Sequence, residues 1–265
     1  MEVLITTSFS ILILNTNTYK LTLLHRGDGL YYGIARNEVN TYVAARKRMV
    51  SSNIPLKDEQ GEIIVFDHNF KLKKRIQAPF PLRDLHQITW YDGKLWMTCP
   101  YDNMVAIWNG VDWQQWFPLS VATDDAHDAH HYNSFMIEED IIWLLAHNHG
   151  PSELIAFSIH DKSLLQKVTL GTQAHNIWRE KGQLYTCSSG NGQILGDMGF
   201  SLKLGGFPRG YACDGKCRYV GMSELAERKV RDLTTGKILI FDLEWNLIKT
   251  ILLYNEGLVL DILSL

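Results

Sequence analysis

The sequence predicts an all-β protein, a single six-bladed β-propeller over residues 1–265, from three observations. Short runs rich in β-branched and aromatic residues cover the chain, separated by Gly, Asp and Asn, and extended helical periodicity is nearly absent. A pattern of strand, glycine turn and strand recurs with a fixed aromatic spacing. The two ends of the chain supply complementary parts of one such unit. Six four-stranded blades of about 44 residues each account for this length.

The recurring unit begins with a head residue, and an aromatic residue follows ten positions later. It is clearest in 86-HQITWYDGKLWM-97 and 175-HNIWREKGQLYTC-187, where Trp96 and Tyr185 follow a histidine at equal distance. In 131–150 the turn is two residues longer and Trp143 takes the aromatic position. The remaining units are 32–46 with Tyr42 and 209–224 with Tyr219. We expect these aromatic residues on the second strand of each blade.

The sixth blade is assembled from both ends of the chain. The stretch 2–24 has the pattern of a second, third and fourth strand, and 256–265 that of a first strand. The N-terminal strands should therefore pair with the C-terminal strand and close the ring. The apolar N-terminal stretch is interrupted by polar residues at 6–8 and has no basic start, so we interpret it as strands and not as a signal or an anchor.

Composition limits the partners. A net charge of −3 without a block of Lys or Arg gives no basis for nucleic-acid binding, and we expect no membrane contact and a small-molecule partner. The four cysteines show no metal or redox spacing. Cys213 and Cys217 flank a turn, where either a hairpin disulfide or two reduced thiols would fit. We expect a cytoplasmic protein, and the sequence leaves the oligomeric state open.

Six head residues should meet at one mouth of the central channel, because the first strand of each propeller blade lines that channel. Three of the six are histidine, in a chain with only ten histidines among 265 residues. The heads are Tyr32, His86, His131, His175, Arg209 and Glu256.

Several strings resemble an uncharacterised bacterial propeller group catalogued as domain of unknown function 4915. They are 207-FPRGYACDGKCRYVGMSELAER-228, 175-HNIWREKGQLYTCSSGNGQI-194, 86-HQITWYDGKLWM-97 and 256-EGLVLDILSL-265. The order of motifs is kept over roughly residues 80 to 265. The chain departs from the pattern at Ala174, where the group has proline, and at 130-HHYNSF-135, which replaces a Cys-His-x-Asn head. The resemblance implies a propeller and important roles for His86, His131, His175 and Arg209, and it brings no activity with it.

Three converging imidazoles suit a divalent transition metal such as iron, zinc, copper or nickel. Three nitrogen ligands leave positions open for water and substrate, as in catalytic zinc sites. We therefore predict a metal-dependent enzyme, a hydrolase or an oxidoreductase, acting on a small polar or anionic molecule at the channel, with His86, His131 and His175 as ligands. The alternative for these histidines is structural: hydrogen bonds to blade carbonyls that hold the ring together.

The other three heads receive roles that complement a metal. Arg209 would hold a carboxylate or phosphate of the substrate with its planar guanidinium. Tyr32 would donate a hydrogen bond to a developing oxyanion. Glu256 would act as a fourth ligand, as a partner that fixes an imidazole tautomer, or as a general base.

The segment 124-DDAHDAHHYNSF-135 adds further candidates. His127 could fold over the channel mouth, and His130 should point away from its neighbour. The acidic residues could orient imidazoles or simply solvate a loop; they are Asp124, Asp125 and Asp128. His147 and His149 end a second strand, and we place them at the opposite mouth from the heads, where they could form a second metal site or have no role in one.

A non-catalytic function is the alternative for the whole protein. A propeller face can bind a protein, peptide or glycan as a scaffold without doing chemistry. Trp108, Trp113 and Trp116 would serve such a module, although they also suit packing between blades.

Overall fold

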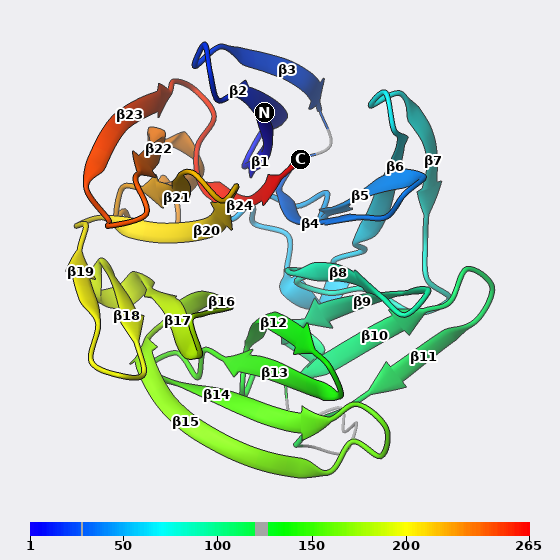
Figure 1. Ribbon diagram of the computed structural model, residues 1–265. Coiled ribbons are helices and arrows are strands. Elements are labelled where there is room, and N and C mark those ends of the chain that lie inside the picture. The colour runs from blue at the N-terminus through cyan, green and yellow to red at the C-terminus, as the bar shows by residue number, and fades with distance from the viewer. Residues whose placement is uncertain (28, 120–126) are drawn as a thin grey trace. The chain divides into compact units, whose positions relative to one another are not determined.

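Six four-stranded antiparallel sheets make up the protein (Figure 1). The computed structural model describes residues 1–27, 29–119 and 127–265. The predicted fold class is confirmed: the chain is a six-bladed β-propeller with four-stranded blades. Asp124 and Asp125 lie outside the described residues, so their predicted roles stay predictions.

The chain divides into two compact units of three sheets each. Unit 1 comprises residues 1–77 and 209–265, and unit 2 comprises residues 78–208. Among the described residues the only helical elements are short 3₁₀ turns, and no helix is long and apolar enough to cross a membrane.

Unit 1 contains the blade built from both chain ends. Its strands, in spatial order, are β24 (Val259–Ser264), β1 (Glu2–Thr7), β2 (Ser10–Asn15) and β3 (Leu21–Arg26). The first and last strands of the chain pair antiparallel, with Leu4 opposite Leu263 and Ile5 opposite Ile262. In Figure 1 the blue β1 accordingly lies beside the red β24. The predicted closure by the two chain ends is confirmed.

The other sheets of unit 1 follow the chain in order. One is β4 (Tyr31–Arg36), β5 (Asn40–Ala45), β6 (Glu62–Asp67) and β7 (Leu72–Ile76), with the 3₁₀ turn η1 (Leu56–Asp58) between β5 and β6. The next is β20 (Phe207–Cys213), β21 (Arg218–Ser223), β22 (Gly236–Phe241) and β23 (Leu247–Leu253). The long connection between β21 and β22 carries the 3₁₀ turn η4 (Arg231–Leu233).

Unit 2 has three sheets with the same order. The first is β8 (Ile88–Tyr91), β9 (Lys94–Cys99), β10 (Met104–Trp108) and β11 (Trp113–Trp116), with η2 (Pro100–Asp102). The second is β12 (Tyr132–Glu138), β13 (Ile141–Ala146), β14 (Pro151–Ser158) and β15 (Leu164–Thr172). The third is β16 (Ala174–Glu180), β17 (Gln183–Ser188), β18 (Gln193–Gly196) and β19 (Ser201–Lys203), with η3 (Ser189–Asn191).

The core of each unit lies between neighbouring sheets. In unit 1, Val3 and Ile5 of the closing blade pack with Tyr219 and Ile240 of the preceding sheet. In unit 2, side chains of β9 and β10 pack with those of β12, β13 and β14. The aromatic residues of the repeat all lie on second strands and are at most 9% exposed: Tyr42, Trp96, Trp143, Tyr185 and Tyr219. The ten-residue spacing therefore marks a residue packed between blades.

Candidate functional site

Four imidazole rings form a row in unit 2. The ring centroids of His86 and His131 lie 5.3 Å apart. His147 follows, 4.7 Å from His131 and 5.3 Å from His175. His149 stands beside the row, 5.1 Å from His131. The row is largely shielded from solvent: His86 is 3% exposed, His147 8% and His175 5%. The three predicted ligand histidines thus belong to one connected group.

Irregular strand starts place these rings. His131 immediately precedes β12 and has a left-handed backbone, with φ 49°. The pairing of β12 with β13 shifts directly after Tyr132, and that of β16 with β17 shifts between His175 and Ile177, where Asn176 has φ 57°. Such bulges redirect the neighbouring side chains and are common at functional sites.

His147 and His149 lie at the same end of the sheet as His131, and our placement of them at the opposite mouth is wrong. The backbone N–H of His147 donates to the carbonyl of His131 over 3.2 Å, and that of Asn148 donates to the carbonyl of His130 over 3.0 Å. Because β13 runs antiparallel to β12, its last residues return to the start of β12. The predicted second site therefore merges with the first.

Hydrogen bonds fix the tautomers of His86 and His175. The Nδ1 nitrogen of His86 contacts the backbone carbonyl of Asp84, which can only accept, so Nδ1 carries the proton. Nδ1 of His175 lies 2.8 Å from Ser189 Oγ. Since Ser189 donates its single proton to the carbonyl of Pro208 over 2.6 Å, it accepts from His175. Both rings therefore carry their lone pair on Nε2.

His131 has the same tautomer. Its Nδ1 lies 2.6 Å from Asp128 Oδ1 and 3.8 Å from Asp84 Oδ2. A carboxylate accepts the Nδ1 proton and leaves Nε2 with the lone pair. Histidines that bind metals usually donate their other ring N–H to a carboxylate or a carbonyl in this way. His86 and His131 meet this condition, while His175 donates to a serine hydroxyl.

His147 has the opposite tautomer. Its Nδ1 accepts the backbone N–H of His149 over 3.1 Å, so a neutral His147 carries its proton on Nε2. Nε2 of His149 in turn lies 2.8 Å from the carbonyl oxygen of Asp128. His147 is thus suited to donate a hydrogen bond, in the middle of a row whose other rings offer lone pairs.

Two groups of three residues bring their ligand atoms within 4.8 Å of one another. One is Asp84, His86 and His131, and the other is Asp128, His131 and His149. Each offers two imidazoles and one carboxylate, which is a donor set found in zinc hydrolases and in non-haem iron oxygenases. His175 is a member of neither group.

Asp84 is the residue of this site that the sequence reasoning missed. It lies two residues before His86, is 4% exposed and has a left-handed backbone with φ 54°. Its Oδ1 lies 3.7 Å from Nδ1 of His86. An Asp-x-His string immediately before a first strand was the available signal. Asp128, named as a residue that could orient imidazoles, contacts His131 as described above.

His127 and His130 lie apart from the row, each against a tyrosine. His127 stacks on Tyr101 with ring centroids 4.5 Å apart, and His130 stacks on Tyr132 at 5.3 Å. Burial lowers the pKa of His130, and the nearby charge of Lys167 acts in the same direction. The His130 ring lies on Tyr132 and the His131 ring beside His147, so these neighbouring side chains point differently, as predicted.

In unit 1, Tyr32 and Arg209 come together. Nη1 of Arg209 donates to the phenol oxygen of Tyr32 over 3.4 Å, and Nη1 of Arg46 donates to the same oxygen over 3.4 Å. Arg46 also makes a two-bonded ion pair with Glu59, at 2.8 and 2.7 Å. Arg48 Nη1 lies 3.9 Å from Glu59. Sequence reasoning found the tyrosine and Arg209 but not the other three residues.

Glu256 contacts two strands of the closing blade, β3 and β1. It forms an ion pair with Arg26 and accepts a hydrogen bond from Thr7 Oγ1 over 3.4 Å. It is 9% exposed and precedes β24 by three residues. These contacts fix the connection that leads into the closing strand.

The three candidate tryptophans pack between strands. Trp108 and Trp113 stack with centroids 5.9 Å apart, and Trp113 also meets the ring of Phe80 edge-on at 5.8 Å. Trp116 lies edge-on to Phe157 of β14, 5.1 Å away. Trp116 thus packs between blades, as one alternative predicted, whereas Trp108 and Trp113 stack within their own sheet.

Fold and site together define a six-bladed propeller with a buried histidine and aspartate cluster. No family model and no curated protein matches the chain. Solved structures share the fold: one, described as a nidogen/laminin complex, has a TM-score of 0.71 at 12% identity, covering 99% of this chain and 97% of that one. A protein of unknown function from Bacteroides caccae has a TM-score of 0.70 at 11% identity, with the same coverage.

A third similar structure is an enzyme. Catalytically inactive virginiamycin B lyase from Staphylococcus aureus, in complex with quinupristin, has a TM-score of 0.55 at 15% identity. The match covers 81% of this chain and 71% of that chain. At these identities the likenesses establish the fold alone, and propellers host unrelated chemistries.

Proposed function

We propose that this protein is a metal-dependent enzyme that acts on a small polar or anionic molecule, with a divalent transition metal at the histidine row of unit 2. The observation that carries the proposal is the shared tautomer of His86, His131 and His175. Each donates Nδ1–H to a protein acceptor, which leaves the Nε2 lone pair for a metal or a proton.

Within the row, His86 and His131 are the proposed ligands through Nε2, and the Asp84 carboxylate, 3.7 Å from Nδ1 of His86 and 3.8 Å from Nδ1 of His131, is proposed to orient both rings. Two imidazole ligands leave coordination positions open for water and substrate. The bound metal would polarise a substrate oxygen or lower the pKa of its water, or activate oxygen if it is iron or copper. His175, whose ligand atom lies outside this group, keeps its lone pair on Nε2 and is proposed to accept a proton at that atom.

Arg209 and Tyr32 remain the proposed substrate-binding and oxyanion-stabilising residues. Their support is the direct contact between them and the burial of both side chains, Arg209 at 7% and Tyr32 at 5% exposure. Arg46, which is hydrogen-bonded to Glu59, donates to the same phenol oxygen. Because this oxygen accepts from both guanidinium groups, the phenol proton points away from them. We retain Glu256 as a candidate general base, although its contact with Arg26 favours a structural role.

Elemental analysis of the purified, untagged protein tests the proposal. We expect about one equivalent of iron, zinc, copper or nickel in the wild type and its loss in His86→Ala and His131→Ala. His160→Ala is the matched control, because His160 is exposed and pairs with Asp140 at the surface. A wild type that stays metal-free after reconstitution with each of the four metals would refute the metal centre.

A non-catalytic binding module for a protein, peptide or glycan is the second candidate. The observation in its favour is a pocket at the other end of the strands of unit 2, away from the histidine row. The two functions separate on one variant: an enzyme loses turnover in His131→Ala with its fold intact, whereas a binding module keeps its affinity.

A further inference from the structure

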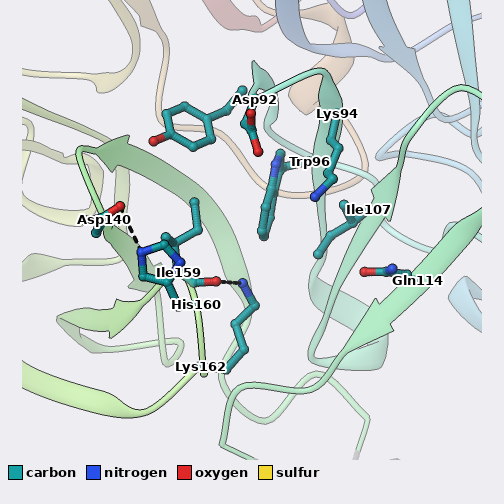
Figure 2. A pocket seen from close by; sticks show the side chains of 10 residues that line it. Asp92, Lys94, Trp96, Ile107, Gln114, Asp140, Ile159, His160 and Lys162 are labelled. Atoms are coloured by element: carbon teal, nitrogen blue, oxygen red, sulfur yellow. Dashed lines mark hydrogen bonds and ion pairs between the residues drawn. The ribbon is translucent and has the colours of Figure 1, made fainter.

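A cavity of about 710 Å³ opens between the first two sheets of unit 2, at the ends of β8 and β12 opposite to the histidine row. Figure 2 shows its lining. One wall comes from the turn between β8 and β9 and from the strands after it, and the other from the turns that follow β12 and β14. The volume suits a small organic molecule.

The floor of the cavity is apolar and its sides carry two amines. Trp96, Ile107 and Ile159 belong to the hydrophobic cluster beneath it. Lys94 and Lys162 line the cavity from its two walls. Figure 2 shows the Lys94 amine beside Trp96, and the Lys162 amine at the backbone of Ile159.

Lys162 is held over aromatic rings. Its Nζ lies 4.6 Å from the ring centroid of Trp96 and 5.3 Å from that of Trp116, and it donates to the carbonyl of Ile159. Its backbone has φ 62°, a left-handed conformation that glycine or asparagine adopts at lower cost. Burial lowers the pKa of Lys162, and the positive charge of Lys94 lowers it further. The two amines therefore repel each other across the cavity.

Trp96 adds a buried donor to this wall. It is 4% exposed, and within the described part of the chain its indole Nε1–H has no hydrogen-bond partner. A buried donor without an acceptor is unfavourable, because it has lost its hydrogen bonds to water. The Lys162 amine lies over the ring of this tryptophan, 4.6 Å from its centroid.

Two carboxylates also line the cavity, those of Asp92 and Asp140. Asp140 pairs with His160 over 3.0 Å, both side chains being 73% exposed. Asp161, next to Lys162, accepts hydrogen bonds from the backbone N–H and hydroxyl of Ser163, over 3.1 and 2.8 Å. Asp92 is exposed to solvent. The two amines and the indole N–H are donors of the lining above its apolar floor.

We propose that this cavity binds a small organic oxyanion, a phosphate or carboxylate attached to an apolar body. The oxyanion would lie between Lys94 and Lys162, relieve their repulsion and accept the Trp96 N–H, while the apolar body rests on Ile107 and Ile159. Lysine ammonium groups bind phosphate as point charges. The site is independent of the metal centre, so either proposal can fail without the other.

Calorimetric titration tests the proposal with phenyl phosphate, benzoate and uncharged phenol as probes, at low salt and with EDTA present so that no metal contributes. We expect saturable binding of phenyl phosphate or benzoate and none of phenol; the stronger of the two anions identifies the headgroup. Lys94→Met should weaken the binding about tenfold or more, since it removes a charge-assisted hydrogen bond to the anion.

Trp96→Phe should also weaken binding, because it removes the indole N–H and keeps an aromatic ring on the floor. Lys203→Met is the matched control, since Lys203 is exposed on the edge strand β19. If circular dichroism shows that Trp96→Phe is misfolded, the test rests on Lys94→Met. Absence of saturable anion binding, or equal affinities in wild type, Lys94→Met and Lys203→Met, would overturn the proposal.

Discussion

The Nδ1 nitrogen of His131 lies 2.6 Å from the carboxylate of Asp128, three residues earlier in the chain. This hydrogen bond holds the imidazole in the tautomer whose Nε2 can bind a metal. The negative charge of the Asp128 carboxylate makes the ring a better electron donor. Asp128 itself has a left-handed backbone, with φ 56°, in the segment that leads into β12. The chain thus places a positioning carboxylate and its histidine in one short turn.

We expect Asp128→Asn to weaken metal binding about 10- to 100-fold, the usual effect of removing the hydrogen-bond partner of a ligating histidine. Competition with a chromophoric chelator measures this affinity. Asp140→Asn is the control, because it removes an equally charged carboxylate from an exposed histidine pair. Equal affinities for Asp128→Asn and wild type would show that the Asp128–His131 bond does not support a metal ligand.

Ser189→Ala should change the tautomer of His175. Ser189 Oγ is the acceptor for the Nδ1 proton of His175, and it passes its own proton to the carbonyl of Pro208. Without this acceptor, the Nε2-protonated form gains population, and the buried Nδ1–H loses about 1–3 kcal/mol of stabilisation. Nitrogen-15 NMR of the imidazoles reads the tautomer directly.

The control for this experiment is Ser201→Ala, which removes an exposed hydroxyl bonded to Gln193 in the same sheet. It should leave the His175 signals unchanged. If wild-type His175 already carries its proton on Nε2, the shared tautomer of the three histidines is refuted, and with it the main support for the metal centre.

The sequence was sufficient for the fold because a propeller blade is a local structure. A glycine turn of fixed length brings the residue ten positions after the head onto the second strand, where Trp96 and Tyr185 both pack between blades. One end of the chain supplies three strands of a blade and the other end supplies the missing first strand, and β1 does pair with β24. Hydrophobic alternation and turn length determine both features.

The sequence was less informative about the site. The predicted position of His147 is wrong because an antiparallel second strand ends beside the start of the first, and Tyr132 accordingly pairs with Ala146. Arg46 and Glu59 pair across an irregular connection, where no periodicity reveals which side chains meet. Asp84 lies in a similar segment before β8. Contacts between irregular segments depend on tertiary packing, which one sequence does not display.

Glu59→Gln should destabilise the protein strongly. The side chains of Glu59 and Arg46 are 0% and 3% exposed, and Arg48 adds a second positive charge 3.9 Å from the same carboxylate. Removing the carboxylate leaves buried guanidinium charge without this partner, which typically costs about 3–5 kcal/mol. Urea denaturation measures the change in the free energy of unfolding.

Glu138→Gln is the matched control, because Glu138 pairs with Arg179 at 2.7 Å while the side chains are 38% and 29% exposed. We expect about 1 kcal/mol or less for this partly exposed pair. A loss for Glu59→Gln as small as that of Glu138→Gln would mean that other groups neutralise the arginines, and that Glu59 does not hold Arg46 against Tyr32.

Tyr219 should make the protein less stable at alkaline pH. Burial raises the pKa of Tyr219, and its hydrogen bond to Asp214, at 2.8 Å, raises it further. Above about pH 10 the unfolded chain releases the phenol proton while the folded protein keeps it. The unfolded state then binds fewer protons, so the free energy of unfolding falls with rising pH, by about 1.4 kcal/mol per pH unit for one proton.

Tyr219→Phe should flatten this slope in urea titrations between pH 10 and the folded-state pKa, whereas Tyr254→Phe, which removes an exposed phenol, should not. An unchanged slope in Tyr219→Phe would show that Tyr219 ionises as readily in the folded protein as in the unfolded chain.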